Sequence, residues 1–344
     1  MSLVEELIPG IDNKLPFLNE TVWLYLPEVQ CNFKCQYCYL NRNGLPRGKA
    51  KHDTNFILPE CIRGKNKWIV IYGGEVLTDK VLLYSLISEI RKRTPNTIIF
   101  SSNGLLLKDE DITFFENNNV KISLSYDGKY QKYRGPDVLQ LKKDIIYKAI
   151  SHNVIIGLNT VVHSKNYTDY KFDLPGIDII HDYNYIYPAE TETNKEFLFD
   201  NSLSEYISDE VLFSMKSLLL DISKLTLDQI VLKYPPSQFY RLEQLLIIYS
   251  KNYDKPSFKE GSFCLQQDCF KVDIYGKKYN TCGKGSEIST LSHDNKACFN
   301  CRYFQICPYK CPAYNFDKTQ CKETYMYKIY EKLDSLLNYL KNKS

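Results

Sequence analysis

Residues 22–38 read VWLYLPEVQCNFKCQYC, a short apolar run followed directly by three cysteines. The run at 22–27 is rich in β-branched and aromatic residues, which predicts a β-strand. The loop after it carries Cys31, Cys35 and Cys38, which are separated by three and two residues. Such a loop can surround one small metal centre, although an ordinary structural zinc or iron–sulfur site uses four ligands. The stretch therefore predicts a strand whose carboxyl end carries a metal-binding loop that is one ligand short.

Beyond this loop, β-rich runs alternate with helical periodicity up to about residue 190. The expected strands are 22–27, 68–72, 97–101, 120–125, 154–162 and 177–187. Helical spacing of apolar residues predicts a helix around Leu83–Ile90, with Thr78 as its N-cap, and further helices at 107–118 and 137–151. Successive βα units favour an α/β fold, a partial (β/α)6 TIM-like barrel, with an open doubly wound sheet as the alternative.

The pattern changes after the sixth expected strand. Residues 203–250 look helical with an interruption at Pro235–Pro236, and 255–321 are rich in cysteine and poor in periodicity. The last segment places Ile329, Leu333, Leu336 and Leu340 on one helical face. We therefore expect four units: a barrel at 1–200, a helical bridge at 201–254, a small cysteine-rich iron–sulfur domain at 255–325, and a C-terminal helix at 326–344.

Composition limits the classes of protein that fit. The chain has 344 residues, 44% of them hydrophobic, and a formal net charge of +3. So small a charge argues against a dedicated nucleic-acid or membrane-surface partner. We find neither a signal peptide nor an apolar run long enough for a membrane span. We therefore expect a cytoplasmic protein, in which the 12 cysteines stay reduced and clustered ones bind metal.

Four further motifs follow the expected strands in order. They are Gly73-Gly74-Glu75, Ser102-Asn103-Gly104, Ser125-Tyr126-Asp127-Gly128 with Tyr133-Arg134-Gly135 after it, and Asn159-Thr160-Val161-Val162. Together with the CxxxCxxC loop, which has an aromatic residue before its third cysteine, this set resembles the radical S-adenosylmethionine (SAM) superfamily. The resemblance covers roughly residues 20–190.

The resemblance implies a cofactor and the residues that hold it. Cys31, Cys35 and Cys38 would ligate a catalytic [4Fe–4S] cluster whose fourth iron binds SAM. The cluster would reduce SAM to a 5′-deoxyadenosyl radical, which removes a hydrogen atom from the substrate. The expected SAM-binding residues are Tyr37, Gly73, Gly74, Glu75, Asn103, Ser123, Ser125 and Arg134. Ser123 and Ser125 point to the same face of their strand, so either hydroxyl is a candidate. The alternative is a zinc loop completed by a distant ligand.

Eight cysteines near the C-terminus form a second set. Their spacing resembles the SPASM domain, an extension of many radical SAM enzymes, and this implies two auxiliary [4Fe–4S] clusters, or three clusters in all. The implied ligands are Cys264, Cys269, Cys282 and Cys311 for one cluster, and Cys298, Cys301, Cys307 and Cys321 for the other. The alternative is a pair of zinc ribbons built on the CxxC at Cys298 and Cys301.

The resemblance also implies a substrate class. We expect an oxidoreductase-type maturase that crosslinks or otherwise oxidises a side chain of a peptide or protein, such as a ribosomally made precursor peptide. A small molecule such as an amino sugar is the runner-up, and a non-catalytic iron–sulfur or zinc protein is the alternative of another class. Sulfatase maturation fits less well, because Gly283 follows Cys282 where those enzymes place an acid.

The expected partners follow from this reading. A flavodoxin or ferredoxin would supply electrons. Only 30 residues precede Cys31, so we expect no N-terminal leader-binding domain in this chain. Either a separate leader-binding protein or the helical segment 203–250 would then bind the leader.

Overall fold

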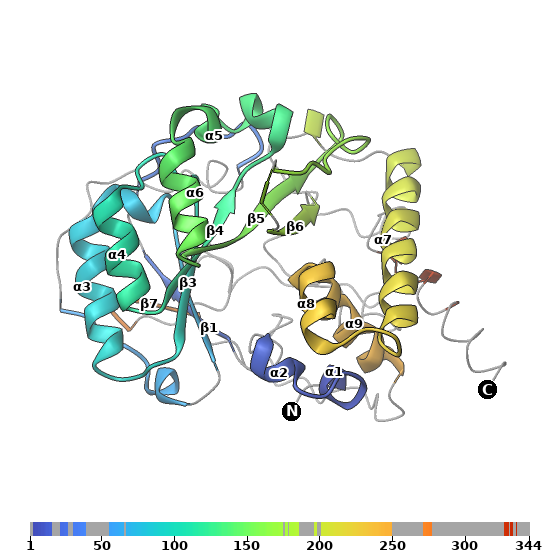
Figure 1. Cartoon of the computed structure of the whole chain (residues 1–344), viewed down its shortest axis with the longest axis horizontal. Coiled ribbons are helices and arrows are strands. Elements are labelled where there is room, and N and C mark those ends of the chain that lie inside the picture. The colour runs from blue at the N-terminus through green and yellow to red at the C-terminus, as the bar shows by residue number, and fades with distance from the viewer. Residues whose placement is uncertain are drawn as a thin grey trace, which may run out of the picture.

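The structure is a computed structural model that describes residues 3–15, 21–26, 30–38, 55–64, 67–174, 176–177, 179–185, 196–197, 201–249, 271–276, 327–329, 331–332 and 335. Within these residues, a parallel seven-stranded sheet forms the centre of the molecule (Figure 1). Its strands are β1 (Thr21–Tyr25), β2 (Trp68–Tyr72), β3 (Thr97–Ser102), β4 (Val120–Ser125), β5 (Ile155–Val162), β6 (Ile180–Tyr185) and β7 (Lys271–Asp273).

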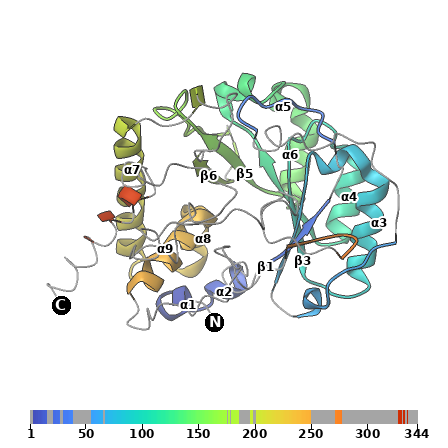
Figure 2. The same ribbon diagram turned by 180° about the vertical axis from the view of Figure 1, so that it is seen from behind.

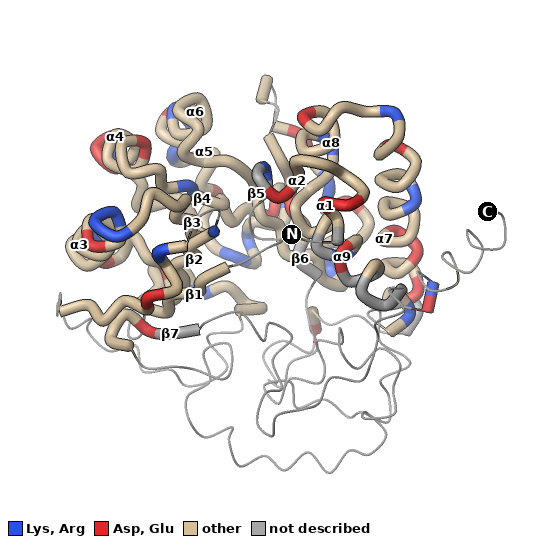
Figure 3. Tube along the Cα trace, turned by 90° about the horizontal axis from the view of Figure 1, so that it is seen from below, with Lys and Arg blue, Asp and Glu red and all other residues tan. Residues whose placement is uncertain are grey.

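The order of the strands decides between the two expected architectures. In space they follow the sequence β6-β5-β4-β3-β2-β1-β7, and every pairing is parallel. A doubly wound sheet reverses its strand order at a switch point, and β1 to β6 show no such reversal. The strands form an open arc with α3, α4 and α6 on its outer side (Figure 3). The partial α/β barrel is therefore confirmed and the doubly wound alternative is wrong.

The outer side of the arc holds the main hydrophobic core. Alternate strand residues such as Ile71, Phe100 and Leu124 are fully buried there, and they belong to one cluster with Leu86 and Phe115 of the covering helices. The helices and 3₁₀ turns of this half are η3 (Glu60–Arg63), η4 (Val76–Asp79), α3 (Lys80–Arg91), α4 (Asp109–Asn117), η5 (Gly128–Tyr133), α5 (Val138–Leu141) and α6 (Lys143–Ser151). The alternate strand residues that are not in this core face the inner side of the arc, where a functional site can lie.

The N-cap of α3 differs from our prediction. The helix is capped by Asp79, whose Oδ1 accepts from the backbone N–H of Leu82 at 3.0 Å, and not by Thr78. Thr78 lies inside η4, where its hydroxyl donates to the Glu75 carbonyl at 2.7 Å. Both residue types cap helices well, and the turn before the helix decides between them.

Two further differences concern element boundaries. The helix expected over 137–151 is divided at Lys142, whose φ of −134° is not helical, into α5 and α6. The second difference is an additional strand, β7, which lies within the expected cysteine-rich domain. It pairs with β1 in the register Trp23↔Lys271 and Tyr25↔Asp273.

A second group of helices lies beside the β6 end of the sheet (Figure 2). Its members are α1 (Leu3–Leu7), α2 (Ile11–Lys14), α7 (Asn201–Asp221), α8 (Leu227–Lys233) and α9 (Pro236–Tyr249). They share a core that includes Val4, Val211 and Leu242, so the N-terminal residues pack against α9. The expected helical character of 203–250 is confirmed, with breaks at 222–226 and at Pro235.

The C-terminal helix is described only in part. Residues 327–329, 331–332 and 335 are helical, and Ile329 is buried in the second core. Leu333, Leu336 and Leu340 lie outside the described residues, as do the eight C-terminal cysteines. In the described part of the chain, we find no helix with both the length and the apolar character needed to cross a membrane.

Candidate functional site

The motif loops meet at the carboxyl edge of the sheet. Because the strands are parallel and paired in register, such as Tyr25↔Tyr72 and Ser101↔Ser123, the loops after β1, β2, β3 and β4 emerge side by side. The CxxxCxxC loop follows β1, and the three other expected SAM-contacting loops follow its neighbours. In barrels this edge carries the reactive groups.

Glu75 fastens two of these loops together. Its side chain is almost fully buried, and its Oε1 accepts from the Ser102 hydroxyl at 2.9 Å and from the Leu77 N–H at 3.1 Å. Its Oε2 accepts from the Asn103 N–H at 2.8 Å. Burial raises the pKa of this carboxyl, and the three hydrogen bonds oppose the rise. Glu75 is one of the residues expected to contact SAM, and in the structure its carboxylate also fastens the loops of the protein itself.

The same two loops hold the chain on either side of Cys31. The Glu75 N–H donates to the carbonyl of Gln30 at 2.9 Å. The Asn103 side-chain amide donates to Oδ1 of Asn32 at 2.8 Å. Cys31 is itself exposed, and the buried residues Glu75 and Asn103 hold the backbone on either side of it. We call this arrangement of Glu75 and Asn103 around Cys31 the cradle. Gly73 and Gly74 form the half-buried bend between β2 and Glu75.

The rest of the cysteine loop is fixed against η5. The Gln36 N–H donates to the Tyr133 carbonyl at 2.9 Å, and the Cys38 N–H donates to the Cys35 carbonyl at 3.1 Å. Phe33 is buried directly against Gly135, where a Cβ would lie 2.8 Å from the Phe33 ring. Glycine in the Tyr-Arg-Gly motif therefore makes room for the cysteine loop.

The donor set of this loop fits an iron–sulfur cluster. Cys31, Cys35 and Cys38 each offer one sulfur donor, and burial raises the pKa of Cys35 to about 12, which Arg134 opposes. Among the described residues, no three His, Cys, Asp or Glu side chains gather where one metal ion could bind. The thiolates of a [4Fe–4S] cluster ligate different irons, so they lie further apart than the ligands of one ion. Three cysteine thiolates at this spacing are the donors that an iron–sulfur cluster takes.

The serine pair of β4 is placed as expected. Burial alternates along β4, and Ser123 and Ser125 are both half-buried on the face opposite Ile122 and Leu124. This face is the inner side of the arc. Ser125 pairs with Asn159 of β5, so the motif on β5 lies beside it.

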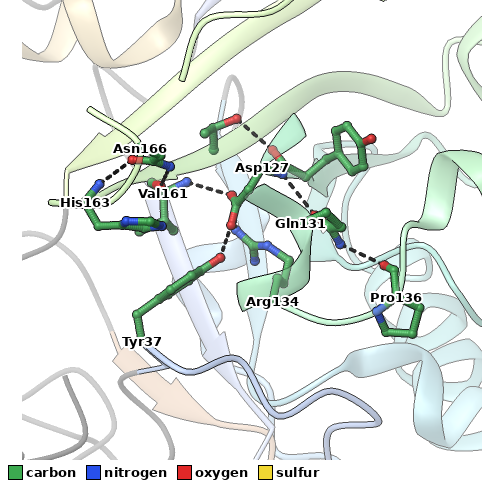
Figure 4. Close-up of polar contacts among 10 residues, drawn as sticks. Tyr37, Asp127, Gln131, Arg134, Pro136, Val161, His163 and Asn166 are labelled. Atoms are coloured by element: carbon green, nitrogen blue, oxygen red, sulfur yellow. Dashed lines mark hydrogen bonds and ion pairs between the residues drawn. The ribbon is translucent and has the colours of Figure 1, made fainter. Parts of the chain in front are cut away.

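Asp127 is the centre of a buried polar network that sequence reasoning missed (Figure 4). It is fully buried, and its Oδ2 accepts from the Tyr37 hydroxyl. Its Oδ1 accepts from Nη2 of Arg134 at 2.9 Å and from the Val161 N–H at 3.1 Å. We expected Tyr37 and Arg134 to contact SAM, and the structure brings both to this aspartate.

His163 is a second residue whose position we did not foresee. Its side chain is fully buried among Tyr37, Tyr133 and Phe197, with ring centroids 5.0–5.7 Å apart. Nδ1 accepts from the Lys165 N–H at 3.1 Å, and Nε2 has no hydrogen-bond partner within the described structure. A lone histidine among scattered ones gives no sequence signal of this kind.

Protonation of His163 should make stability depend on pH. Burial lowers its pKa from 6.5 to about 4, so the unfolded chain takes up this proton first and acid favours unfolding between these two values. From pH 7 to 5.5 this group alone should cost about 1 kcal/mol. Urea unfolding at both pH values should show that His163→Gln loses this part of the pH dependence. An identical pH dependence in the variant would contradict it.

Comparison with known proteins agrees with the geometry. Residues 21–144 match a family described as a 4Fe-4S single cluster domain. The serine-type anaerobic sulfatase-maturating enzyme of Bacteroides thetaiotaomicron is 26% identical over an alignment of 174 residues. The alignment covers 46% of this chain and 39% of that protein. The chain thus spans well under half the length of this curated relative.

Two solved structures share the fold. One is native anSMEcpe with bound AdoMet and the Cp18Cys peptide, at a TM-score of 0.55 and 15% identity, covering 93% of this chain and 99% of that one. The other is Streptococcus suis SuiB bound to the precursor peptide SuiA, at a TM-score of 0.50 and 13% identity, covering 90% and 77%. At these identities the likeness is one of fold.

The fold and the cradle around Cys31 define a protein built around an iron–sulfur loop at the carboxyl edge of a partial barrel. Together with the motif set, the match of residues 21–144 to a 4Fe-4S single cluster domain indicates an iron–sulfur protein that resembles the radical SAM enzymes. The expected [4Fe–4S] domain in this part of the chain is confirmed by the family match.

Proposed function

We propose that this protein is an enzyme that cleaves SAM reductively and oxidises a side chain of a peptide or protein. The observation that carries the proposal is the cradle around Cys31. Hydrogen bonds from Glu75 and Asn103 fix the chain on both sides of this cysteine. In a non-catalytic iron–sulfur protein, hydrogen bonds between the cluster loop and the loops after β2 and β3 would have no role in binding a substrate.

Each part of the cradle has a role in this proposal. Cys31, Cys35 and Cys38 would ligate the [4Fe–4S] cluster, which supplies one electron and, with SAM, a 5′-deoxyadenosyl radical. The residues that would surround SAM are Tyr37, Gly73, Gly74, Asn103, Ser123, Ser125 and Arg134. Glu75 would hold the loops after β2 and β3 through the three hydrogen bonds that its carboxylate accepts, and its remaining acceptor position would serve the SAM ammonium.

The substrate class rests on the relatives. Two of the proteins that share the fold were solved with peptides, and the curated relative is named for maturing a sulfatase. A peptide or protein substrate is therefore favoured over a small molecule. Crosslinking or another net oxidation of a side chain fits best, because the auxiliary clusters proposed next would carry away an electron.

The C-terminal cysteines supply the rest of the proposal. They lie outside the described residues, and we propose that they hold two auxiliary [4Fe–4S] clusters in the ligand sets given above. A flavodoxin or ferredoxin would be the electron donor, and a separate protein or the α7–α9 region would bind a leader peptide.

Reductive cleavage of SAM tests the enzymatic proposal most directly. The anaerobically reconstituted protein with dithionite should form 5′-deoxyadenosine, and Arg134→Ala should need ten to a hundred times more SAM. This is the loss expected on removing a charged hydrogen bond of about 1.5–3 kcal/mol. The measurements are product quantification by liquid chromatography and SAM binding by equilibrium dialysis. Reconstituted protein that carries iron but never cleaves SAM would favour the non-catalytic alternative.

A further inference from the structure

Asp127 joins segments that are distant in sequence. It follows β4, and its carboxylate accepts from Tyr37 of the cysteine loop, from Arg134 after η5, and from the backbone of Val161 at the end of β5. The aspartate is itself held, because its N–H donates to Oε1 of Gln131 at 3.0 Å. In Figure 4 these side chains converge on Asp127 from separate elements.

The burial of this carboxylate makes its partners hard to replace. Asp127 has no exposed surface, so an ion there must be neutralised and hydrogen-bonded to stay charged. Arg134 neutralises it, and its own side chain is 10% exposed. The guanidinium also lies 5.6 Å from the centre of the Tyr37 ring. The aspartate, the tyrosine and the arginine therefore form one rigid unit.

The two oxygens of Asp127 serve different parts of the site. Oδ2 holds the residue just before Cys38, and Oδ1 holds the arginine expected to bind an anionic group of SAM. Nε of Arg134 is buried and has no hydrogen-bond partner in the described structure. Buried donors without a partner are rare in folded proteins, and this one is available to a ligand.

From this arrangement we infer that Asp127 is a positioning residue, which sets the cysteine loop and Arg134 at a fixed distance from each other. It would act on SAM affinity through Arg134 and on the cluster through the cysteine loop, and it would not touch SAM itself. The inference rests on the proposed function, since it requires a cluster on the loop and SAM beside it.

The chain contains a matched control for this unit. Asp111 is also fully buried, accepts from the Tyr84 hydroxyl, and pairs with a cation, Lys80, at 2.5 Å. It lies on α4 against α3, on the outer side of the sheet. Substitutions there remove the same chemistry from a buried aspartate without touching the cysteine loop.

A double-mutant cycle on SAM affinity tests the inference. In reconstituted protein, Asp127→Asn should weaken SAM binding roughly tenfold. In an Arg134→Gln background the same substitution should change affinity less than about twofold, because its effect passes through the arginine. Asp111→Asn should leave SAM affinity and iron content unchanged. Full additivity of Asp127→Asn and Arg134→Gln would overturn the inference.

Tyr37→Phe tests the link between Asp127 and the cysteine loop, which we call the loop arm. This variant also keeps the inference falsifiable if Asp127→Asn does not fold. It removes one hydroxyl and should change the electron paramagnetic resonance spectrum of the reduced, SAM-bound cluster, with iron content unchanged. Tyr84→Phe should leave that spectrum as in the wild type. A wild-type spectrum in Tyr37→Phe would overturn the loop arm. Wild-type protein that binds neither iron nor SAM would instead refute the proposed function.

Discussion

The triple substitution of Cys31, Cys35 and Cys38 by alanine is expected to abolish SAM cleavage and to remove about a third of the iron. The reason is that these thiols would ligate the one cluster with an open iron, while the C-terminal cysteines would keep two others. With three clusters the wild type should hold about twelve irons per chain, and the variant about eight. Iron determination and 5′-deoxyadenosine formation measure both effects.

Cys61 provides the control for this experiment. It is half-buried and packed against the main core, so Cys61→Ala removes a cysteine away from the loop. It should keep both iron content and SAM cleavage. If the triple variant retained its full iron content, the assignment of the cluster to this loop would be wrong. A wild-type content near four irons would instead remove the two auxiliary clusters from the proposal.

Glu75→Ala should destabilise the protein by at least about 3 kcal/mol and also weaken SAM binding. The substitution leaves three buried donors, on Ser102, Leu77 and Asn103, without their acceptor. Each unsatisfied buried donor costs about 1–3 kcal/mol. Urea unfolding under anaerobic conditions gives the free energy of unfolding, and equilibrium dialysis gives SAM affinity.

Two companions sharpen the Glu75 measurement. Glu75→Gln keeps the size and one acceptor oxygen, so its loss of stability should be smaller than that of alanine. Glu89→Ala removes a glutamate that pairs with Lys92 and Arg93 at the surface of α3, and it should have the smallest effect. Wild-type stability in Glu75→Ala would show that the loops after β2 and β3 are held by other contacts.

Local sequence patterns predicted the strands well because their signal is local. Runs such as 68–72 and 120–125 are apolar, β-branched and bounded by turn residues, and the structure places strands at these same residues. The order of the motifs along the chain also predicted that their loops lie together at the carboxyl edge of the sheet, because the carboxyl ends of parallel strands meet at one edge. Helix starts were less certain, as Thr78 and Asp79 show, because adjacent residues can both cap a helix.

The contacts within the site could not be predicted in the same way. Tyr37 and Asp127 are 90 positions apart, and their hydrogen bond depends on where the loops after β1 and β4 emerge. The role of Glu75 depends likewise on the register of β2 against β3. The motifs contain these residues, but only the folded sheet shows that Glu75 binds the neighbouring loop and that Asp127 joins Tyr37 to Arg134.

The pairing of β7 with β1 has a consequence for how the protein is made. β1 leaves the ribosome about 250 residues before its partner on one side. At ~5–20 residues per second, that edge of β1 waits tens of seconds for its partner. An uncovered edge of this kind is a template for pairing with other chains. Nascent or truncated chains that end before residue 271 should therefore depend most on chaperones, and co-expression of chaperones should benefit the full chain during this interval.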